Sequence, residues 1–125
     1  MTDQAIEQEI QAKGLTAPRI TPADIEANIA SEHYFTGEEA CDSRSSEDIV
    51  HASADLLMVQ RSLSLLTFCV LVLRNGFTVT GESACASPEN FDAELGRKIA
   101  RQNAVAKVWP LMGYELKCRL AGGAK

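Results

Sequence analysis

The sequence predicts an α+β fold: a small single domain, residues 1–125, with N-terminal helices, an antiparallel β-hairpin or sheet, and a long C-terminal helix. Three observations support this prediction. Residues 65–73 form an apolar run rich in β-branched and aromatic side chains, which is typical of a buried strand. Asn75-Gly76 comes next, and this dipeptide favours a hairpin turn because both residues tolerate positive φ. Residues 88–109 then show helical periodicity, opened by Ser87 and Pro88.

Residues 1–14 are expected to form a peripheral helix. Thr2 can cap its first turn, and Gly14 can end it in a left-handed conformation. Ile6 and Ile10 lie four residues apart on one face. Two apolar anchors predict a weakly packed helix.

A second helix is predicted over residues 21–35, after a short linker. Thr21 can cap it, Pro22 suits its first position, and Asp24 places an acid in the first turn. Residues 36–64 show no sustained period and are interpreted as a variable loop containing a short helix that starts near Ser46.

Residues 65–120 are expected to form the core, with the hairpin packed on the long helix. On a helical wheel, one apolar arc is predicted to face the core: Phe91, Leu95, Ile99, Val105, Ala106 and Trp109. The opposite side carries small residues and suggests a helix–helix contact between subunits: Ala93, Ala100 and Ala104. Pro110 is expected to kink or end the helix. Residues 111–120 suit a short helix or an edge strand, and residues 121–125 are expected to form a disordered tail.

Charge is distributed unevenly along the chain. Of the net charge of −5, residues 1–60 contribute −9 (twelve acids, three bases) and residues 61–125 contribute +4 (nine bases, five acids). The acidic half makes nucleic-acid binding an unfavourable hypothesis, because duplex binding needs a broad basic surface. The basic half could hold a small anion, face the acidic half of a neighbouring subunit, or be ordinary solvated charge.

The sequence carries no sign of secretion, membrane insertion or metal binding. The first thirteen residues are polar and acidic, and the apolar run of nine is far shorter than the roughly 20 residues of a membrane span. A soluble, cytoplasmic protein is therefore expected. The four cysteines form no CxxC pair and have no histidine at ligand spacing, so free thiols and no metal site are predicted.

No catalytic residues are predicted. The sequence lacks a nucleophile elbow, an HExxH motif and a Gly-rich phosphate loop. The carboxylates near the start of the long helix are better explained by compensation of the helix dipole than by a shared site: Glu82, Glu89, Asp92 and Glu94. We therefore expect neither enzyme activity nor a cofactor.

Arg97 and Arg101 are candidate anion ligands. They lie one helical turn apart and could form a fork suited to phosphate. The alternative is local pairing, in which Glu94 engages Arg97 or Lys98. Among the aromatic residues, Phe77 beside the turn is the most plausible platform for stacking a base.

One serial pattern resembles a known family. The pattern reads GF-V-GES-AC, P-NF, G-KIA, NA and WPL-GY, and lies in residues 75–85, 88–91, 96–104, 108–111 and 113–114. Over residues 20–120 the chain resembles a family of small tailed-phage proteins long listed only by phage gene numbers. That family in turn is similar to the first type of Thoeris anti-defence proteins. Residues 36–64 match no part of the pattern.

The resemblance implies a phage or prophage anti-defence protein. Such a protein binds a small cyclic nucleotide signal, either glycocyclic ADP-ribose or a cyclic oligonucleotide, and sequesters it without cleaving it. The implied assembly is a dimer or hexamer with pockets at subunit junctions. Residues that could supply the ligand contacts are Phe77, Asn90, Phe91, Arg97, Arg101, Asn103 and Lys107. An adaptor that binds a host protein through the acidic half is the alternative.

Overall fold

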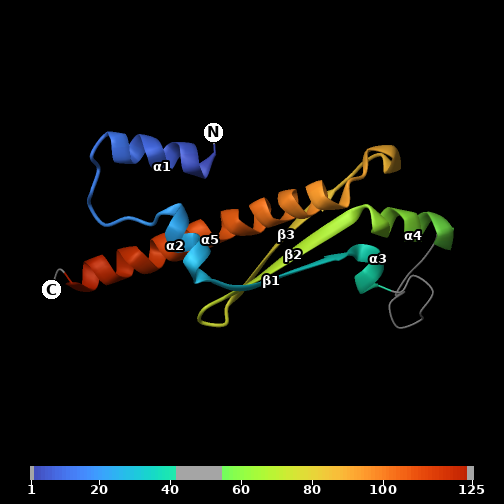
Figure 1. The fold of residues 1–125 in the computed structure, drawn as a ribbon. Coiled ribbons are helices and arrows are strands. Elements are labelled where there is room, and N and C mark those ends of the chain that lie inside the picture. The colour runs from blue at the N-terminus through green and yellow to red at the C-terminus, as the bar shows by residue number, and fades with distance from the viewer. Residues whose placement is uncertain (1, 42–54, 124–125) are drawn as a thin grey trace.

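The predicted α+β class is confirmed by a computed structural model, which describes residues 2–41 and 55–123 (Figure 1). Short helices precede and interrupt a small sheet, and one long helix ends the chain. The elements are α1 (Asp3–Ala12), α2 (Pro22–Asn28), β1 (Ile29–Thr36), α3 (Gly37–Ala40), α4 (Leu56–Ser64), β2 (Leu66–Leu73), β3 (Thr78–Ala84), a 3-10 turn (Pro88–Asn90) and α5 (Ala93–Gly123).

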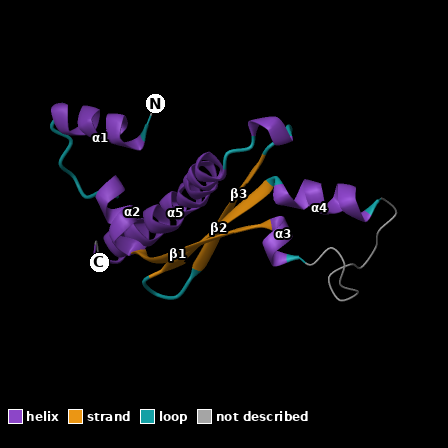
Figure 2. Cartoon of the chain, turned by 45° about the vertical axis from the view of Figure 1, so that its right-hand side comes forward, coloured by secondary structure: helices purple, strands orange, loops and turns teal. Residues whose placement is uncertain are grey.

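The sheet is antiparallel, with strand order β1-β2-β3, and α5 lies across one of its faces (Figure 2). Alternate residues of the central strand β2 are buried toward this helix: Thr67, Cys69, Leu71 and Leu73. The intervening side chains are half-buried on the opposite, open face: Leu66, Phe68, Val70 and Val72. The core therefore lies between the sheet and α5, as expected for one helix packed on a sheet with one solvated face.

The face of α5 that meets the sheet differs from the predicted arc. Ala100, Ala104 and Val108 are fully buried, whereas the predicted core residues Leu95 and Ile99 are 54% and 40% exposed. The helix approaches β3 so closely that only small side chains fit between the two backbones. The wheel prediction is correct for Val105 and Trp109, which pack against the core, and wrong for Leu95 and Ile99, because it treats apolar size as the signal of burial. Ala100 and Ala104 are filled by the sheet of the same chain, so the predicted helix–helix contact between subunits is wrong for these two alanines, whereas Ala93 is exposed.

Gly81 explains this close approach. A Cβ at this position would overlap the carbonyl oxygen of Ala100 and the amide nitrogen of Ala104, and would lie 2.9 Å from the Cα of Ala104. Gly96, one turn before Ala100, faces the side chains of Thr67 and Ser83 in the same way. Small residues at every fourth position of α5 thus form the groove into which the sheet fits.

The predicted helix over residues 21–35 is correct only in its first half. Thr21 and Asp24 form a capping box, with the Thr21 hydroxyl accepting from the Asp24 amide (3.1 Å) and the Asp24 carboxylate accepting from the Thr21 amide (2.9 Å). The helix ends at Asn28, and Ile29–Thr36 pairs with β2 as a third strand. Pairing with β2 satisfies the backbone groups of both strands, and this long-range gain outweighs the local helical signal.

The long helix has different ends from those predicted. Pro88 lies in the 3-10 turn, and α5 begins at Ala93 after Asp92, whose carboxylate accepts from the Leu95 amide (3.0 Å). Pro110 lies inside α5 and does not end it. Proline costs the helix one backbone hydrogen bond, and α5 continues through it. The edge-strand alternative is thus wrong, and the expected tail is helical through Gly123; residues 124–125 lie outside the described residues.

The two predicted left-handed glycines are confirmed. Gly14 follows α1 with φ 67°, and the Thr2 hydroxyl caps the same helix through the Ala5 amide (3.1 Å). Gly76 has φ 88°, whereas Asn75 does not have positive φ. The Leu73 amide bonds the carbonyl oxygen of Phe77 (2.8 Å), so the hairpin has a three-residue loop with glycine in the left-handed position rather than the expected two-residue turn.

The variable segment contains two described helices. α3 follows β1 directly, and α4 begins after Asp55, whose carboxylate accepts from the Leu57 amide (2.9 Å). The predicted start near Ser46 lies outside the described residues.

All four cysteines are free thiols, as predicted, and Cys69 is fully buried. No described helix is both long and apolar enough to cross a membrane.

Candidate functional site

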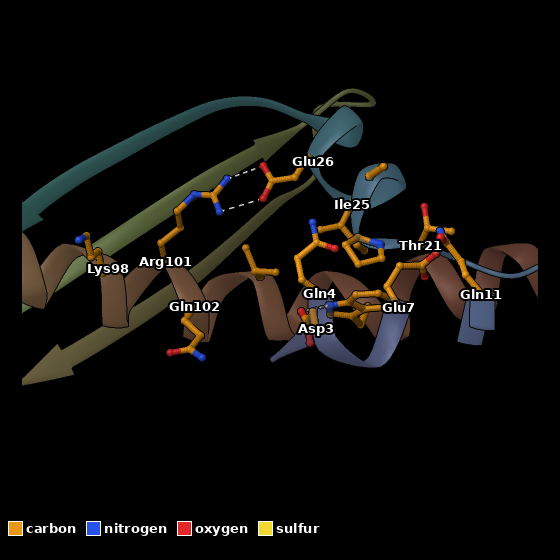
Figure 3. Close-up of a pocket in the computed structure, with 14 residues that line it drawn as sticks. Asp3, Gln4, Glu7, Gln11, Thr21, Ile25, Glu26, Lys98, Arg101 and Gln102 are labelled. Carbon is orange, nitrogen blue, oxygen red and sulfur yellow. Dashed lines mark hydrogen bonds and ion pairs between the residues drawn. The ribbon is translucent and has the colours of Figure 1, made fainter. Parts of the chain in front are cut away.

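A cleft of about 650 Å³ lies between α1, α2 and α5 (Figure 3). Its volume is within the range of about 300–1,000 Å³ that is usual for small-molecule sites. Lys98 and Arg101 of α5 lie at one end, and Asp3, Glu7 and Gln11 of α1 lie at the other. We call these the cationic end and the acidic end after the residues of α5 and α1 that line them; Glu26 also lines the cationic end and pairs with Arg101 there.

Arg101 is the centre of the cationic end. Its two terminal nitrogens donate to the two carboxylate oxygens of Glu26 (3.0 and 2.7 Å), as the dashed lines in Figure 3 show. Its Nε donates to Glu32 (3.2 Å). Arg101 thus joins α5 to α2 and β1. Its guanidinium holds the pKa of Glu26 below the ordinary value, so the contribution of this pair to stability is present at neutral pH and is lost as the pH falls through that lowered pKa.

Glu32 is anchored from its other side. The Tyr34 hydroxyl donates to the second Glu32 oxygen (2.9 Å). Burial, followed by this neighbouring carboxylate, raises the pKa of Tyr34. Glu32 is consequently held by two partners, whereas the one described side-chain partner of Glu26 is Arg101.

Trp109 lies on the acidic side of the cleft. It is half-buried against the core, and its indole nitrogen donates to the Asp3 carboxylate of α1 (3.1 Å). Deeper in the same wall, Ile25 is almost fully buried and Val105 is half-buried. The cleft therefore combines an indole edge and an apolar wall with polar groups from three helices.

α1 is held to the linker by an ion pair. Arg19 donates to both carboxylate oxygens of Glu7, and Gln11 donates to one of them (2.7 Å). The hydrogen bond from Arg19 lowers the pKa of Glu7. Glu7 is 8% exposed, so the only charged group among the buried residues that the structure describes is neutralised locally. This pair fixes the position from which Asp3 reaches Trp109.

The cleft contains one of the seven predicted ligand residues, Arg101. Lys98 also lines it, and pairs with Glu94 (3.4 Å) as the local-pairing alternative anticipated. Arg97 is exposed, and no described residue forms an ion pair with it. Of the two guanidiniums of the predicted fork, Arg101 lines the cleft and Arg97 does not.

The other predicted ligand residues lie elsewhere. Phe77 is 55% exposed at the hairpin turn, where β3 begins. Asn90 and Phe91 line a smaller pocket after β3 ends. Seven strand residues separate the two places by about 23 Å. Asn103 donates to the Glu82 carbonyl oxygen (2.8 Å) and so supports β3, and Lys107 is exposed one turn further along α5.

Several cleft residues are not recognisable as site residues in the sequence. Ile25 and Glu26 are identifiable there only as part of a helix, and Asp3 and Gln4 only as part of a peripheral one. The one available signal is the capping box at Thr21, which fixes the start of α2 and so places Ile25 and Glu26 within this helix. The capping box does not indicate which helix Ile25 and Glu26 face, because that depends on the pairing of β1 with β2, which sets the position of α2.

The acidic half of the chain is used largely within the molecule. All nine described acids among residues 1–60 accept a hydrogen bond or form an ion pair: Asp3, Glu7, Glu9, Asp24, Glu26, Glu32, Glu38, Glu39 and Asp55. Two of them, Glu26 and Glu32, meet Arg101 from the basic half. At Arg101, negative charge from residues 1–60 is therefore neutralised by positive charge from residues 61–125 of the same chain.

The contact between Asp3 and Trp109 makes a direct prediction. We expect Asp3→Ala to shift the fluorescence emission of Trp109 to longer wavelength, because the indole loses its carboxylate partner and gains water. The free energy of unfolding should change by less than about 1 kcal/mol, since the bond is exposed. Glu9→Ala, which removes the exposed pair with Lys13, is the control and should leave the emission unchanged. An unchanged spectrum in Asp3→Ala would contradict the contact.

A comparison with protein families matches residues 20–120 to the Phage protein (N4 Gp49/phage Sf6 gene 66) family. The matched stretch contains α2, the whole sheet and α5 as far as Leu120, whereas α1 precedes it. No curated protein and no solved structure gives a match. The match covers most of the chain and agrees with the resemblance to phage proteins known by gene number. The chain therefore belongs to the Phage protein (N4 Gp49/phage Sf6 gene 66) family.

Proposed function

We propose that this phage protein binds and sequesters a small cyclic nucleotide signal, glycocyclic ADP-ribose or a cyclic oligonucleotide, without cleaving it, and so acts against host defence. The observation that carries the proposal is the polarised cleft between α1, α2 and α5. It offers cations for phosphate at one end and an aromatic edge with polar groups at the other. The resemblance to Thoeris anti-defence proteins supplies the ligand class.

Each part of such a ligand has a chemical match in the cleft. Lys98 and Arg101 suit phosphate oxygens, since charge-assisted bonds to anions are the strongest that these side chains form. The Trp109 ring suits a base. Carboxylates accept bonds from ribose hydroxyls, and the amides serve base edges: Gln4, Gln11 and Gln102.

Binding without chemistry is supported by the side chains that line the cleft. The one hydroxyl among the described lining residues belongs to Thr21, which caps α2. Those lining residues include neither histidine nor cysteine. We accordingly propose a protein that is not an enzyme, works in the cytoplasm and needs no cofactor.

Self-association is part of the proposal. Phe77 and Asn90 lie at opposite ends of β3, so they can contact the same ligand only if a second copy of the chain brings them together. We propose a dimer or hexamer, in which these residues complete a site at a subunit junction. The mass of the native assembly, measured with and without a cyclic nucleotide, tests this; a monomer under both conditions would contradict it.

Calorimetry tests the proposed function. Purified protein titrated with glycocyclic ADP-ribose or a cyclic dinucleotide should release heat at micromolar concentrations, and heating the complex should return the ligand intact. Absence of heat with both ligand classes would contradict binding. Recovery of a cleaved product would contradict sequestration without cleavage.

A second candidate is an adaptor that binds a host protein, and one observation favours it. The open face of β2 presents four half-buried apolar side chains: Leu66, Phe68, Val70 and Val72. Apolar surface of this kind is typical of interaction sites. Val70→Lys should abolish capture of a host protein if the adaptor function is correct. Equal capture by the variant, or none by either protein, would contradict it.

A further inference from the structure

The contact between Glu26 and Arg101 has the geometry of an arginine bound to an anionic ligand. Both carboxylate oxygens accept from the two terminal guanidinium nitrogens, at 3.0 and 2.7 Å. A phosphate group binds arginine through the same two donors. Glu26 therefore fills the position on Arg101 that a phosphate in the cleft would take (Figure 3).

Glu26 can leave this position at low cost. Its side chain is 56% exposed, so its carboxylate is readily rehydrated when the ion pair opens. Exposed ion pairs contribute little to stability because water competes for both charges. Glu32 differs, because the Tyr34 hydroxyl holds its other oxygen and it lies on a strand rather than on a short helix. Glu32 can thus keep Arg101 oriented while Glu26 moves away.

We infer that Glu26 occupies the anion position of the cleft in the ligand-free protein and sets the affinity for phosphate-bearing ligands by competing for Arg101. This inference rests on the proposed function, because it assumes that an anion enters the cleft. Glu32 has the opposite effect, since it positions the guanidinium for the incoming group. The two carboxylates on this one arginine therefore have opposite effects on ligand affinity. Removal of Glu26 strengthens binding, and removal of Glu32 weakens it.

Charge-neutral, nearly isosteric variants test the inference. We expect Glu26→Gln to bind a cyclic dinucleotide, and inorganic pyrophosphate at low salt, about 3- to 10-fold more tightly than the wild-type protein, as measured by calorimetry. Glu32→Gln should bind them more weakly than the wild-type protein, and equal affinity would contradict the positioning role of Glu32. Glu115→Gln removes the same charge from the pair with Arg119 at the far end of α5 and is the matched control, with affinity unchanged.

The outcomes separate the inference from the proposed function. Binding by the wild-type protein with no gain in Glu26→Gln overturns the inference and leaves the function. The same gain in Glu115→Gln overturns it as well, because the effect is then only one of net charge. Binding by Glu26→Gln alone supports the competition for Arg101 but contradicts the proposed function of the wild-type protein. Absence of binding by every variant overturns both.

Discussion

Gly81→Val should lower the free energy of unfolding by about 3–5 kcal/mol, a large share of the roughly 5–15 kcal/mol of a typical domain. A side chain at Gly81 meets backbone atoms of Ala100 and Ala104, which cannot move aside as a flexible side chain would. The helix must therefore lift off β3, and the fully buried Ala100, Ala104 and Val108 lose their contacts. Urea unfolding followed by circular dichroism measures the change.

Gly113→Ala is the matched control, because Gly113 lies in the same helix with open space around it. There the added methyl group should stabilise the protein by about 0.5–1 kcal/mol, since alanine favours the helical backbone more than glycine does. If the urea concentration at the midpoint of unfolding is the same for Gly81→Val as for the wild-type protein, the close packing of α5 on β3 is contradicted. If both variants lose stability equally, the effect belongs to glycine replacement in general.

Arg101→Gln should reduce affinity for a cyclic nucleotide about 10- to 100-fold, because charge-assisted bonds to a phosphate are worth about 1.5–3 kcal/mol. Stability should fall by less than about 1 kcal/mol, since the two carboxylates that it releases are about half exposed. Calorimetry and thermal unfolding measure the two effects separately. A large loss of affinity with little loss of stability assigns Arg101 to binding.

Arg119→Gln is the control for that prediction. Arg119 pairs with Glu115 on α5, far along the helix from the cleft, and its loss removes the same charge. Its affinity should equal that of the wild-type protein. Equal weakening in both variants would show that net charge, rather than the position of Arg101, governs binding.

The elements that the sequence predicts correctly are those whose signals are local. Three kinds of prediction depend on neighbouring residues and are correct in kind: the helix cap at Thr21, the left-handed Gly14 and Gly76, and the buried strand over residues 65–73. The third strand is not predictable in this way, because Ile29–Thr36 becomes a strand only by pairing with β2. The helical signals at Thr21, Pro22 and Asp24 predict a helix that continues past Asn28, where the chain in fact changes to a strand.

The orientation of α5 is not predictable from apolar size. A wheel assigns burial to large apolar residues, yet Leu95 and Ile99 are substantially exposed and Ala100 is buried. The deciding residue is Gly81, on a different strand, which allows the helix backbone to come within contact. A small-residue stripe on the helix together with a glycine in the strand is the pattern that indicates this packing.

The site is predictable only in part for the same reason. Arg101 is identifiable as a candidate anion ligand, but its partners Glu26 and Glu32 lie about 70 residues away and meet it only through the fold. Lys98 and Trp109, predicted in other roles, line the cleft as well. Phe77 is close in sequence to Asn90 and Phe91, but the length of β3 separates it from them.

The environment of Trp109 tests the central claim most directly, because it is the single tryptophan of the chain and lines the proposed binding cleft. Its indole Nε1–H gives one resolved signal in a proton–nitrogen NMR spectrum. We expect that signal to shift in a saturable way as glycocyclic ADP-ribose or a cyclic dinucleotide is added, and to stay in place in Arg101→Gln over the same concentrations. Calorimetrically detected binding that leaves the wild-type indole signal unmoved would contradict the assignment of this cleft as the ligand site.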